Sequence, residues 1–145
     1  MTTGGLFAAA PYHGFADPLD RVMGYLDFRA ALIAGTTAEF TCLVGTMAQE
    51  TFMTNRAIRD ACFESIASHA ETLEADLGAA IEFYGVSGGV TAKGLALHTQ
   101  AVLQGGFILA KAKNDPSVAS ASIGHLRRYF ALLFRQSNPK EENHE

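Results

Sequence analysis

The fold of this chain is decided by residues 95–113, which read Leu95-Ala-Leu-His-Thr-Gln-Ala-Val-Leu-Gln-Gly-Gly-Phe-Ile-Leu-Ala-Lys-Ala-Lys113. When this stretch is drawn as a helix, apolar or small residues fall on nearly every face. The polar side chains before Ala112 are His98, Thr99, Gln100, Gln104 and Lys111. A helix with so little polar surface must be covered on two sides. The stretch therefore predicts a helix over 91–113 that lies inside a helical bundle.

Capping residues and apolar spacing predict further helices on both sides of this stretch. Asp17-Pro18 places an N-cap residue before a proline at the first helical position, and Asp115-Pro116 repeats the arrangement. Apolar residues recur every three or four positions from Asn55 to Tyr84, which indicates a long amphipathic helix. No useful stretch alternates with the period of a strand. We therefore expect an all-α chain of about five helices, at 17–34, 36–53, 55–84, 91–113 and 115–134.

Length and composition limit the class of protein. The chain has 145 residues, of which 48% are hydrophobic and 18% charged, so it has material for one core and is not globally disordered. We expect a flexible arm over 1–16, one helical domain over 17–135 and a disordered tail over 136–145. The formal net charge of −4 is opposite to that of a typical stand-alone nucleic-acid binder.

The cysteines and the apolar runs indicate the compartment. Cys42 and Cys62 lie in helical patterns without the paired spacing of a disulfide framework or a zinc site, so reduced thiols are expected. No apolar run reaches the roughly 18 residues that a membrane span needs, and the first residues do not resemble a signal peptide. These observations predict a cytoplasmic protein without membrane contact.

The sequence lacks the motifs of common enzymes and cofactor sites. No phosphate-binding loop, nucleophile elbow or His-Glu-x-x-His pattern occurs. None of the five histidines lies at metal-ligand spacing from another ligand on the same buried face. We expect no catalytic residue, no metal and no cofactor.

His69 is the polar residue of greatest interest, because the apolar spacing of its helix turns its ring toward the interior. A buried imidazole needs a hydrogen-bond partner. Two interpretations remain open: a core histidine bonded to a backbone carbonyl or a hydroxyl, and a polar group that lines an internal ligand cavity. The same question applies to other polar residues between apolar turns, namely Thr41, Gln49, His98, Thr99 and Gln104. Residues that could wall such a cavity, or equally form plain core, are Phe40, Met47, Phe52, Met53, Phe63 and Phe107.

The apolar helix over 91–113 has more apolar surface than one small domain covers easily. Self-association would cover it, with the last two helices of each chain forming a four-helix interface around a two-fold axis. The alternative is that the first three helices cover this surface alone. The expected dimer interface consists of Leu95, Val102, Gly106, Leu109, Ile123, Leu126 and Phe130.

Several segments together resemble the C-terminal regulatory domain of TetR-family transcriptional regulators. They are Asp17-Pro-Leu-Asp-Arg-Val-Met-Gly-Tyr-Leu, Cys42-Leu-Val-Gly-Thr-Met-Ala-Gln-Glu50, Ala57-Ile-Arg-Asp-Ala61, residues 98–113 and residues 123–134. The resemblance implies an all-helical homodimer of a repressor that binds a small effector in an internal cavity. We expect this effector to be largely apolar and neutral or weakly polar. The candidate ligand-binding residues are Thr41, Gln49, Phe52, Met53, Phe63, His69, Thr99 and Phe107.

The chain also departs from that family's pattern. TetR-family proteins begin with a helix-turn-helix domain, whereas only 16 residues precede Asp17 here. We therefore expect no direct nucleic-acid contact by this chain. Alternatives that remain open are a free-standing helical binder of small molecules, an antirepressor that pairs with a full-length relative, a purely structural dimer, and an enzyme that uses His69 or His98 as an acid-base group.

Overall fold

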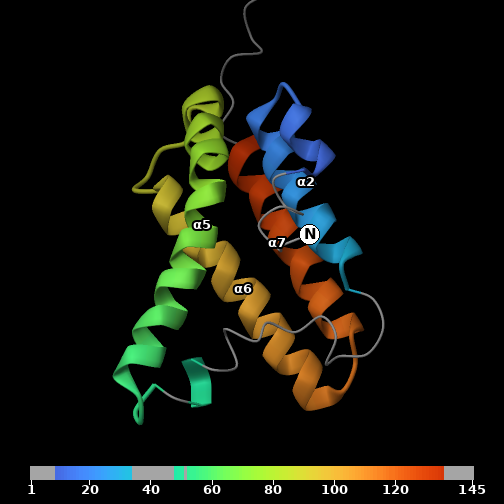
Figure 1. Ribbon diagram of the computed structural model, residues 1–145. Coiled ribbons are helices and arrows are strands. Elements are labelled where there is room, and N and C mark those ends of the chain that lie inside the picture. Colours follow the sequence, from blue (N-terminus) through green and yellow to red (C-terminus); the bar gives the residue numbers. More distant parts are fainter. Residues whose placement is uncertain (1–8, 34–47, 51, 136–145) are drawn as a thin grey trace, which may run out of the picture.

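The computed structural model describes residues 9–33, 48–50 and 52–135, and every regular element in this part of the chain is helical (Figure 1). This confirms the predicted all-α fold class. The elements are the short 3-10 helix η1 (Pro11–Gly14) and the α-helices α2 (Pro18–Ala31), α5 (Arg56–Tyr84), α6 (Ala92–Lys113) and α7 (Ser117–Arg135). Of the helix expected over 36–53, residues 48–50 are described and are helical, whereas 36–47 and 51 lie outside the described residues. Residues 52–53 form a turn, so the predicted end at 53 was wrong.

The helices begin where the sequence places capping side chains. The Asp17 carboxylate accepts a hydrogen bond from the backbone N–H of Leu19 at 2.8 Å. Asn55 caps α5 in the same way, with 3.1 Å from its side-chain oxygen to the N–H of Ile58. These contacts satisfy backbone donors that the first helical turn leaves without partners. The predicted starts of α2 and α5 are thus confirmed.

Two helix ends use the left-handed backbone conformation. Gly85 follows α5 with a φ of 67°, and Asn114 follows α6 with a φ of 52°. Glycine adopts this conformation without steric cost, and asparagine tolerates it better than most residues. Both residues turn the chain back, so α6 packs against α5 and α7 packs against α6.

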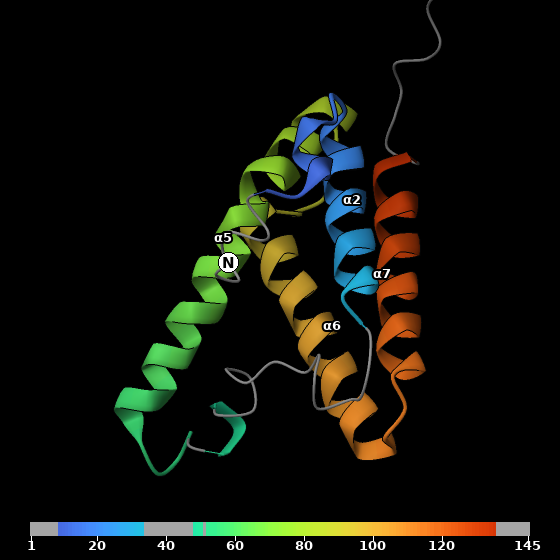
Figure 2. The same cartoon turned by 45° about the vertical axis from the view of Figure 1, so that its right-hand side comes forward.

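The helices form a bundle that is tight at one end and spread at the other. Helices α2 and α7 lie side by side in both views, and α6 crosses them obliquely (Figures 1 and 2). Helix α5 packs on the first part of α6, and its N-terminal half then diverges from α6 (Figure 2). The shared core includes Val22, Leu26, Leu77, Leu103 and Phe130, each at most 1% exposed. The bundle therefore positions α2, α5 and α6 around one interior region.

The segment before α2 is packed onto the bundle. Tyr12, in η1, is 6% exposed, and its ring lies 6.1 Å from the ring of Tyr25 and 5.9 Å from that of Phe28. The sequence suggested a loose arm over 1–16; the structure places Tyr12 of this arm in the core. Residues 1–8 of the expected arm and residues 136–145 of the expected disordered tail lie outside the described residues.

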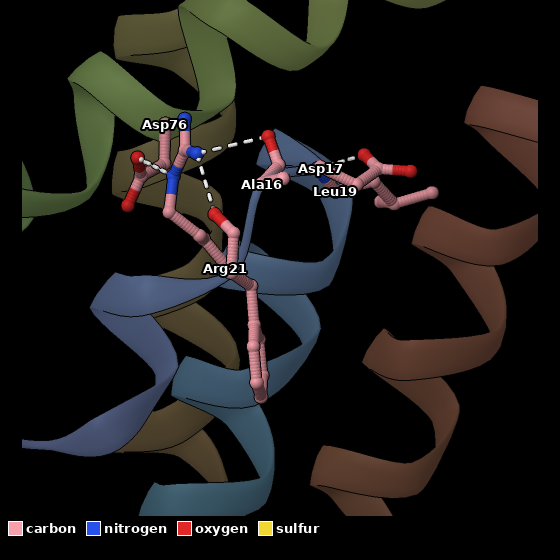
Figure 3. A network of polar contacts seen from close by, with 6 residues as sticks. Ala16, Asp17, Leu19, Arg21 and Asp76 are labelled. Atoms are coloured by element: carbon pink, nitrogen blue, oxygen red, sulfur yellow. Dashed lines mark hydrogen bonds and ion pairs between the residues drawn. The ribbon is translucent and has the colours of Figure 1, made fainter.

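An arginine ties this segment to α2 and α5. Arg21 donates from Nε to the Asp76 carboxylate at 2.6 Å and from Nη1 to the carbonyls of Phe15 and Ala16 at 2.8 and 3.3 Å (Figure 3). The hydroxyl of Tyr84 also donates to the Asp17 carboxylate. The start of α2 is therefore held by side chains of α5 on two sides.

Gly24 leaves room for the side chain of Tyr12, which packs closely against it. A Cβ added at Gly24 would come within 2.4 Å of the Cβ of Tyr12, which is closer than real Cβ contacts. Gly24→Ala should lower the free energy of unfolding by about 1–3 kcal/mol, because Tyr12 must shift out of its contact. Urea denaturation followed by circular dichroism measures the change.

Gly124→Ala is the matched control. Gly124 also lies within a helix, but no atom lies within 4 Å of its added Cβ. The free energy of unfolding of this variant should rise by up to about 1 kcal/mol, because alanine has a better helix propensity than glycine. Equal effects of the two substitutions would contradict the close packing of Tyr12.

Candidate functional site

A polar network joins α2, α5 and α6 in the interior of the bundle. The Tyr25 hydroxyl lies 2.8 Å from Nε2 of His69 and 3.1 Å from Nε2 of Gln100. The guanidinium of Arg29 lies one turn further along α2, with Nη1 at 3.2 Å from the same His69 nitrogen and 3.4 Å from the Tyr25 hydroxyl. Tyr25 and Gln100 are buried, whereas His69 and Arg29 are half-buried. Three helices thus meet at one hydroxyl group.

The hydrogen-bond pattern assigns the tautomer of His69. The nitrogens of Arg29 and Gln100 can only donate, so both donate to the Tyr25 oxygen. The Tyr25 hydroxyl then donates its single hydrogen bond to Nε2 of His69, which also accepts a hydrogen bond from Arg29. Because Nε2 acts as an acceptor, the ring proton of neutral His69 lies on Nδ1.

The surroundings keep His69 uncharged at neutral pH. Burial is the larger cause and the Arg29 guanidinium is the second, and together they lower the pKa of His69 from 6.5 to about 4. Both act in the same direction, because burial and a neighbouring cation each disfavour the imidazolium. The imidazole is therefore a neutral hydrogen-bonding group and a poor proton carrier at pH 7.

This pKa predicts a pH dependence of stability. The unfolded chain binds a proton at His69 below pH 6.5, whereas the folded chain does so only near pH 4. Stability should therefore fall as the pH decreases from 6.5 toward 4, by on the order of 1 kcal/mol at pH 5, since the half-buried ring is partly screened by solvent. Chemical denaturation at pH 7, 6 and 5 tests this.

His69→Gln supplies the comparison, because glutamine can accept the hydrogen bond but does not titrate. The difference in stability between the native chain and His69→Gln should shrink by that amount between pH 7 and pH 5. A difference that stays constant over this range would contradict the lowered pKa of His69.

Aromatic rings surround the charged end of the network. The guanidinium carbon of Arg29 lies 5.6 Å from the ring centroid of Phe107 and 6.0 Å from that of Tyr25. Such contacts favour a cation over the ring faces and hold the guanidinium in place. Phe107 itself is 6% exposed. The polar network thus adjoins aromatic side chains on α2 and α6.

The structure brings together only some of the predicted ligand-binding residues. His69 and Phe107 both contact Arg29. Thr99 is fully buried on the neighbouring helix, and its hydroxyl donates to the carbonyl of Leu95 at 2.9 Å. Four others are exposed, and Thr41 lies outside the described residues. The exposed residues are Gln49, Phe52, Met53 and Phe63.

Sequence reasoning missed the partners of His69. Tyr25 and Arg29 are four residues apart on α2, so they lie on one face of that helix. That spacing is visible in the sequence but gives no reason to pair them with a histidine 40 or more residues away. The sequence did show Gln100 as a polar residue in an otherwise apolar helix. That position was the available indication of a polar contact in the interior.

The residues expected at a dimer interface fall into two groups. Most are buried inside the single chain, where they pack against other helices. Val102 is half-buried, and Leu109 is 57% exposed. The buried members are Leu95, Gly106, Ile123, Leu126 and Phe130.

The part of the chain that the structure describes shows neither a membrane span nor a metal site. Among these residues, no helix is both long and apolar enough to cross a membrane. In the same ranges, no three His, Cys, Asp or Glu side chains gather in a way that could hold a metal ion.

Comparison with known proteins identifies the family. Residues 18–119, which are more than half of the chain, match the family model described as "Transcriptional regulator LmrA/YxaF-like, C-terminal domain". No curated protein and no solved structure matches the chain. The matched range begins at the first residue of α2 and ends within α7, so it includes every residue of the polar network. The chain therefore belongs to the TetR-family C-terminal domains of LmrA/YxaF-like transcriptional regulators.

Proposed function

We propose that this chain is the effector-binding and dimerisation domain of a cytoplasmic TetR-like repressor and has no enzymatic activity. The observation that carries the proposal is the polar network of Tyr25, His69 and Gln100, which joins three helices within the range matched by the family. A small molecule that contacts this network would touch α2, α5 and α6 at once. The free energy of its binding would then favour one arrangement of these helices over others.

The effector is expected to pack beside Phe107 and to bond to the polar network. Phe107 offers an apolar ring next to Arg29, and His69 offers a neutral imidazole. Apolar walls with a few placed polar groups are the usual composition of such sites. The predicted residues Thr41, Gln49, Phe52, Met53 and Phe63 remain candidates for contacts that close the site.

Native mass spectrometry tests both parts of this proposal. The purified chain should appear as a dimer, with an additional small-molecule mass that is lost on denaturation. A thermal-shift screen of small aromatic and apolar molecules should then raise the melting temperature with at least one of them. Phe107→Ala should reduce that shift, whereas His125→Gln, at an exposed histidine of α7, should not. A monomer without ligand that responds to no molecule would refute the proposal.

The outer surfaces of α6 and α7 support dimerisation. His98, Val102, Gly105 and Leu109 lie on one face of α6 by their spacing. The His98 ring lies 5.8 Å from that of Tyr129, so this face continues onto α7. Gly105 has no atom within 4 Å of an added Cβ. A second copy of the chain could therefore approach closely here and cover exposed apolar side chains.

Charge substitutions separate this surface from other exposed apolar residues. Leu109 is 57% and Tyr129 is 41% exposed, so Leu109→Glu or Tyr129→Glu should give monomers without unfolding the chain. Phe83→Glu is the control, because Phe83 is 63% exposed but lies on α5. Sedimentation velocity distinguishes the two outcomes. Dimers that survive both α6 and α7 substitutions would place the interface elsewhere.

One observation bears on the enzyme alternative. Acid-base catalysis by His69 needs a second titratable group in hydrogen-bond reach, and Tyr25 meets that condition at 2.8 Å. The lowered pKa of His69 leaves it unprotonated at pH 7, however, so it lacks the proton that a general acid must supply. We therefore favour a binding role. A small-molecule substrate turned over by the native chain but not by His69→Gln would reverse this choice.

A further inference from the structure

Two exposed histidines lie on the surface that the proposed dimer would bury. His98 is on the face of α6 that continues onto α7, where its ring lies 5.8 Å from that of Tyr129. His125 comes four residues before Tyr129 on α7, so it belongs to the same surface. Histidine is the side chain whose charge ordinarily changes between about pH 5 and 8. The charge of this surface can therefore change with pH.

His98 points away from the acidic helices. It precedes Gln100 by two positions, which is more than half a turn of the helix. Gln100 points into the interior network, which includes Tyr25 of α2 and His69 of α5. The carboxylates of α2 and α5 therefore lie beyond the opposite side of α6. On the side of α7, the groups of this surface that can carry a charge are His125, Arg128, Tyr129 and Arg135.

His125 is likewise turned away from carboxylates. Arg127, two positions further on, pairs with Asp27 of α2 at 3.1 Å, so His125 lies on the other side of α7. Helix α5 meets α7 near Phe134, on the buried side of α7. His125 instead contacts a cation, with 3.4 Å from its Nδ1 to Nη1 of Arg128. Arginine can only donate, so this contact needs an unprotonated Nδ1.

The two helices of this surface contain cations but no aspartate or glutamate. A two-fold dimer brings the same surface of both copies together, so a protonated histidine would meet cations and no carboxylate of the partner's α6 or α7. Among residues 9–33, 48–50 and 52–135, neither histidine forms an ion pair. Like charges that meet in an interface destabilise it. The cations of α6 and α7 are Lys93, Lys111, Lys113, Arg127, Arg128 and Arg135.

We propose that acid separates the dimer: protonation of His98 and His125 charges the surface formed by α6 and α7 and weakens the association of two copies. A neutral imidazole can be covered by the partner at little cost, whereas an imidazolium without a counter-ion cannot. This inference rests on the proposed dimerisation and adds a regulation to it. The subunit association of this domain would thereby respond to pH.

Sedimentation velocity of the native chain at two pH values tests the proposal. The chain should be a dimer at pH 7.5, and its dissociation constant should be about tenfold or more higher at pH 5.5. Added sodium chloride should restore part of the dimer at pH 5.5, because salt screens like charges. Circular dichroism at both pH values verifies that the chain remains folded.

Substitutions identify the groups that are responsible. The double variant His98→Gln with His125→Gln does not titrate at these positions, so it should remain a dimer at pH 5.5. His98→Lys carries a charge already at pH 7.5 and should weaken the dimer there. His69→Gln is the matched control, because His69 lies in the interior network. Its dimer should dissociate in acid as that of the native chain does.

The possible outcomes separate this inference from dimerisation itself. Equal dissociation constants at pH 7.5 and pH 5.5 would overturn the response to acid and leave the dimer intact. Dissociation in acid that persists in the folded double variant would overturn the role of His98 and His125. A folded native chain that is monomeric at both pH values would overturn the proposed dimerisation.

Discussion

Phe130→Ala is expected to lower the free energy of unfolding by about 3–5 kcal/mol, which is a large fraction of the total stability of an ordinary small domain. Phe130 is completely buried, and its ring lies 6.1 Å from that of Phe134 and 5.7 Å from that of Tyr129. Alanine would leave a cavity between α7 and the rest of the core. Urea denaturation followed at 222 nm by circular dichroism measures the loss.

Leu132→Ala is the matched control on the same helix. Leu132 is 58% exposed, so its truncation should lower the free energy of unfolding by less than about 1 kcal/mol. The pair also tests the position of Phe130, which the sequence placed at a dimer interface. A loss of stability that arises inside one chain does not depend on protein concentration. A loss that arises from dissociation of a dimer does depend on it. Equal and concentration-dependent losses in both variants would contradict the structure.

Arg21→Met is expected to lower the free energy of unfolding by about 2 kcal/mol, because it removes the cation that pairs with the partly buried Asp76 carboxylate and bonds to two exposed carbonyls. The side chains of Arg21 and Asp76 are 22% and 17% exposed, with 2.6 Å between Nε and the carboxylate oxygen. Methionine keeps much of the length of the side chain but donates no hydrogen bond. Asp76 and the carbonyls of Phe15 and Ala16 would lose their donor.

The comparison for this ion pair is Arg127→Met. Arg127 and Asp27 are 49% and 61% exposed, and such surface pairs contribute about 0–1 kcal/mol. Denaturant titrations of Arg21→Met, Asp76→Leu and the double variant give the coupling energy of the partly buried pair of Arg21 and Asp76. A cost for Arg21→Met no larger than that for Arg127→Met would show that the Arg21 contacts do not hold the start of α2.

The helices could be predicted from sequence because their ends depend on local contacts. Asp17 and Asn55 bond to backbone groups two or three residues away, and Gly85 adopts a conformation that its own lack of a side chain permits. Such information lies within a few neighbouring residues. The predicted ranges 55–84 and 91–113 therefore differ from the observed α5 and α6 by one residue at the start.

The partners of these helices could not be predicted in the same way. The apolar spacing showed that His69 faces inward and needs a partner, but the Tyr25 hydroxyl that fills this role lies 44 residues away. On α7, the apolar spacing placed Phe130 on the face to be covered, but it did not tell whether that face is covered by the same chain, as it is here, or by a second copy. Long-range packing decides these positions, and a single sequence does not contain it explicitly.

Helix α5 is anchored very unevenly along its 29 residues. Between Arg56 and Ser68 only Cys62 is buried, whereas Ala70, Leu73, Leu77 and Ala80 are all buried in the second half. Local opening is easiest where few apolar contacts must be broken. Amide hydrogens should therefore exchange with deuterium quickly at the start of this helix and slowly near its end. One continuous helix thereby provides a firm half that holds the bundle together and a half that can open on its own.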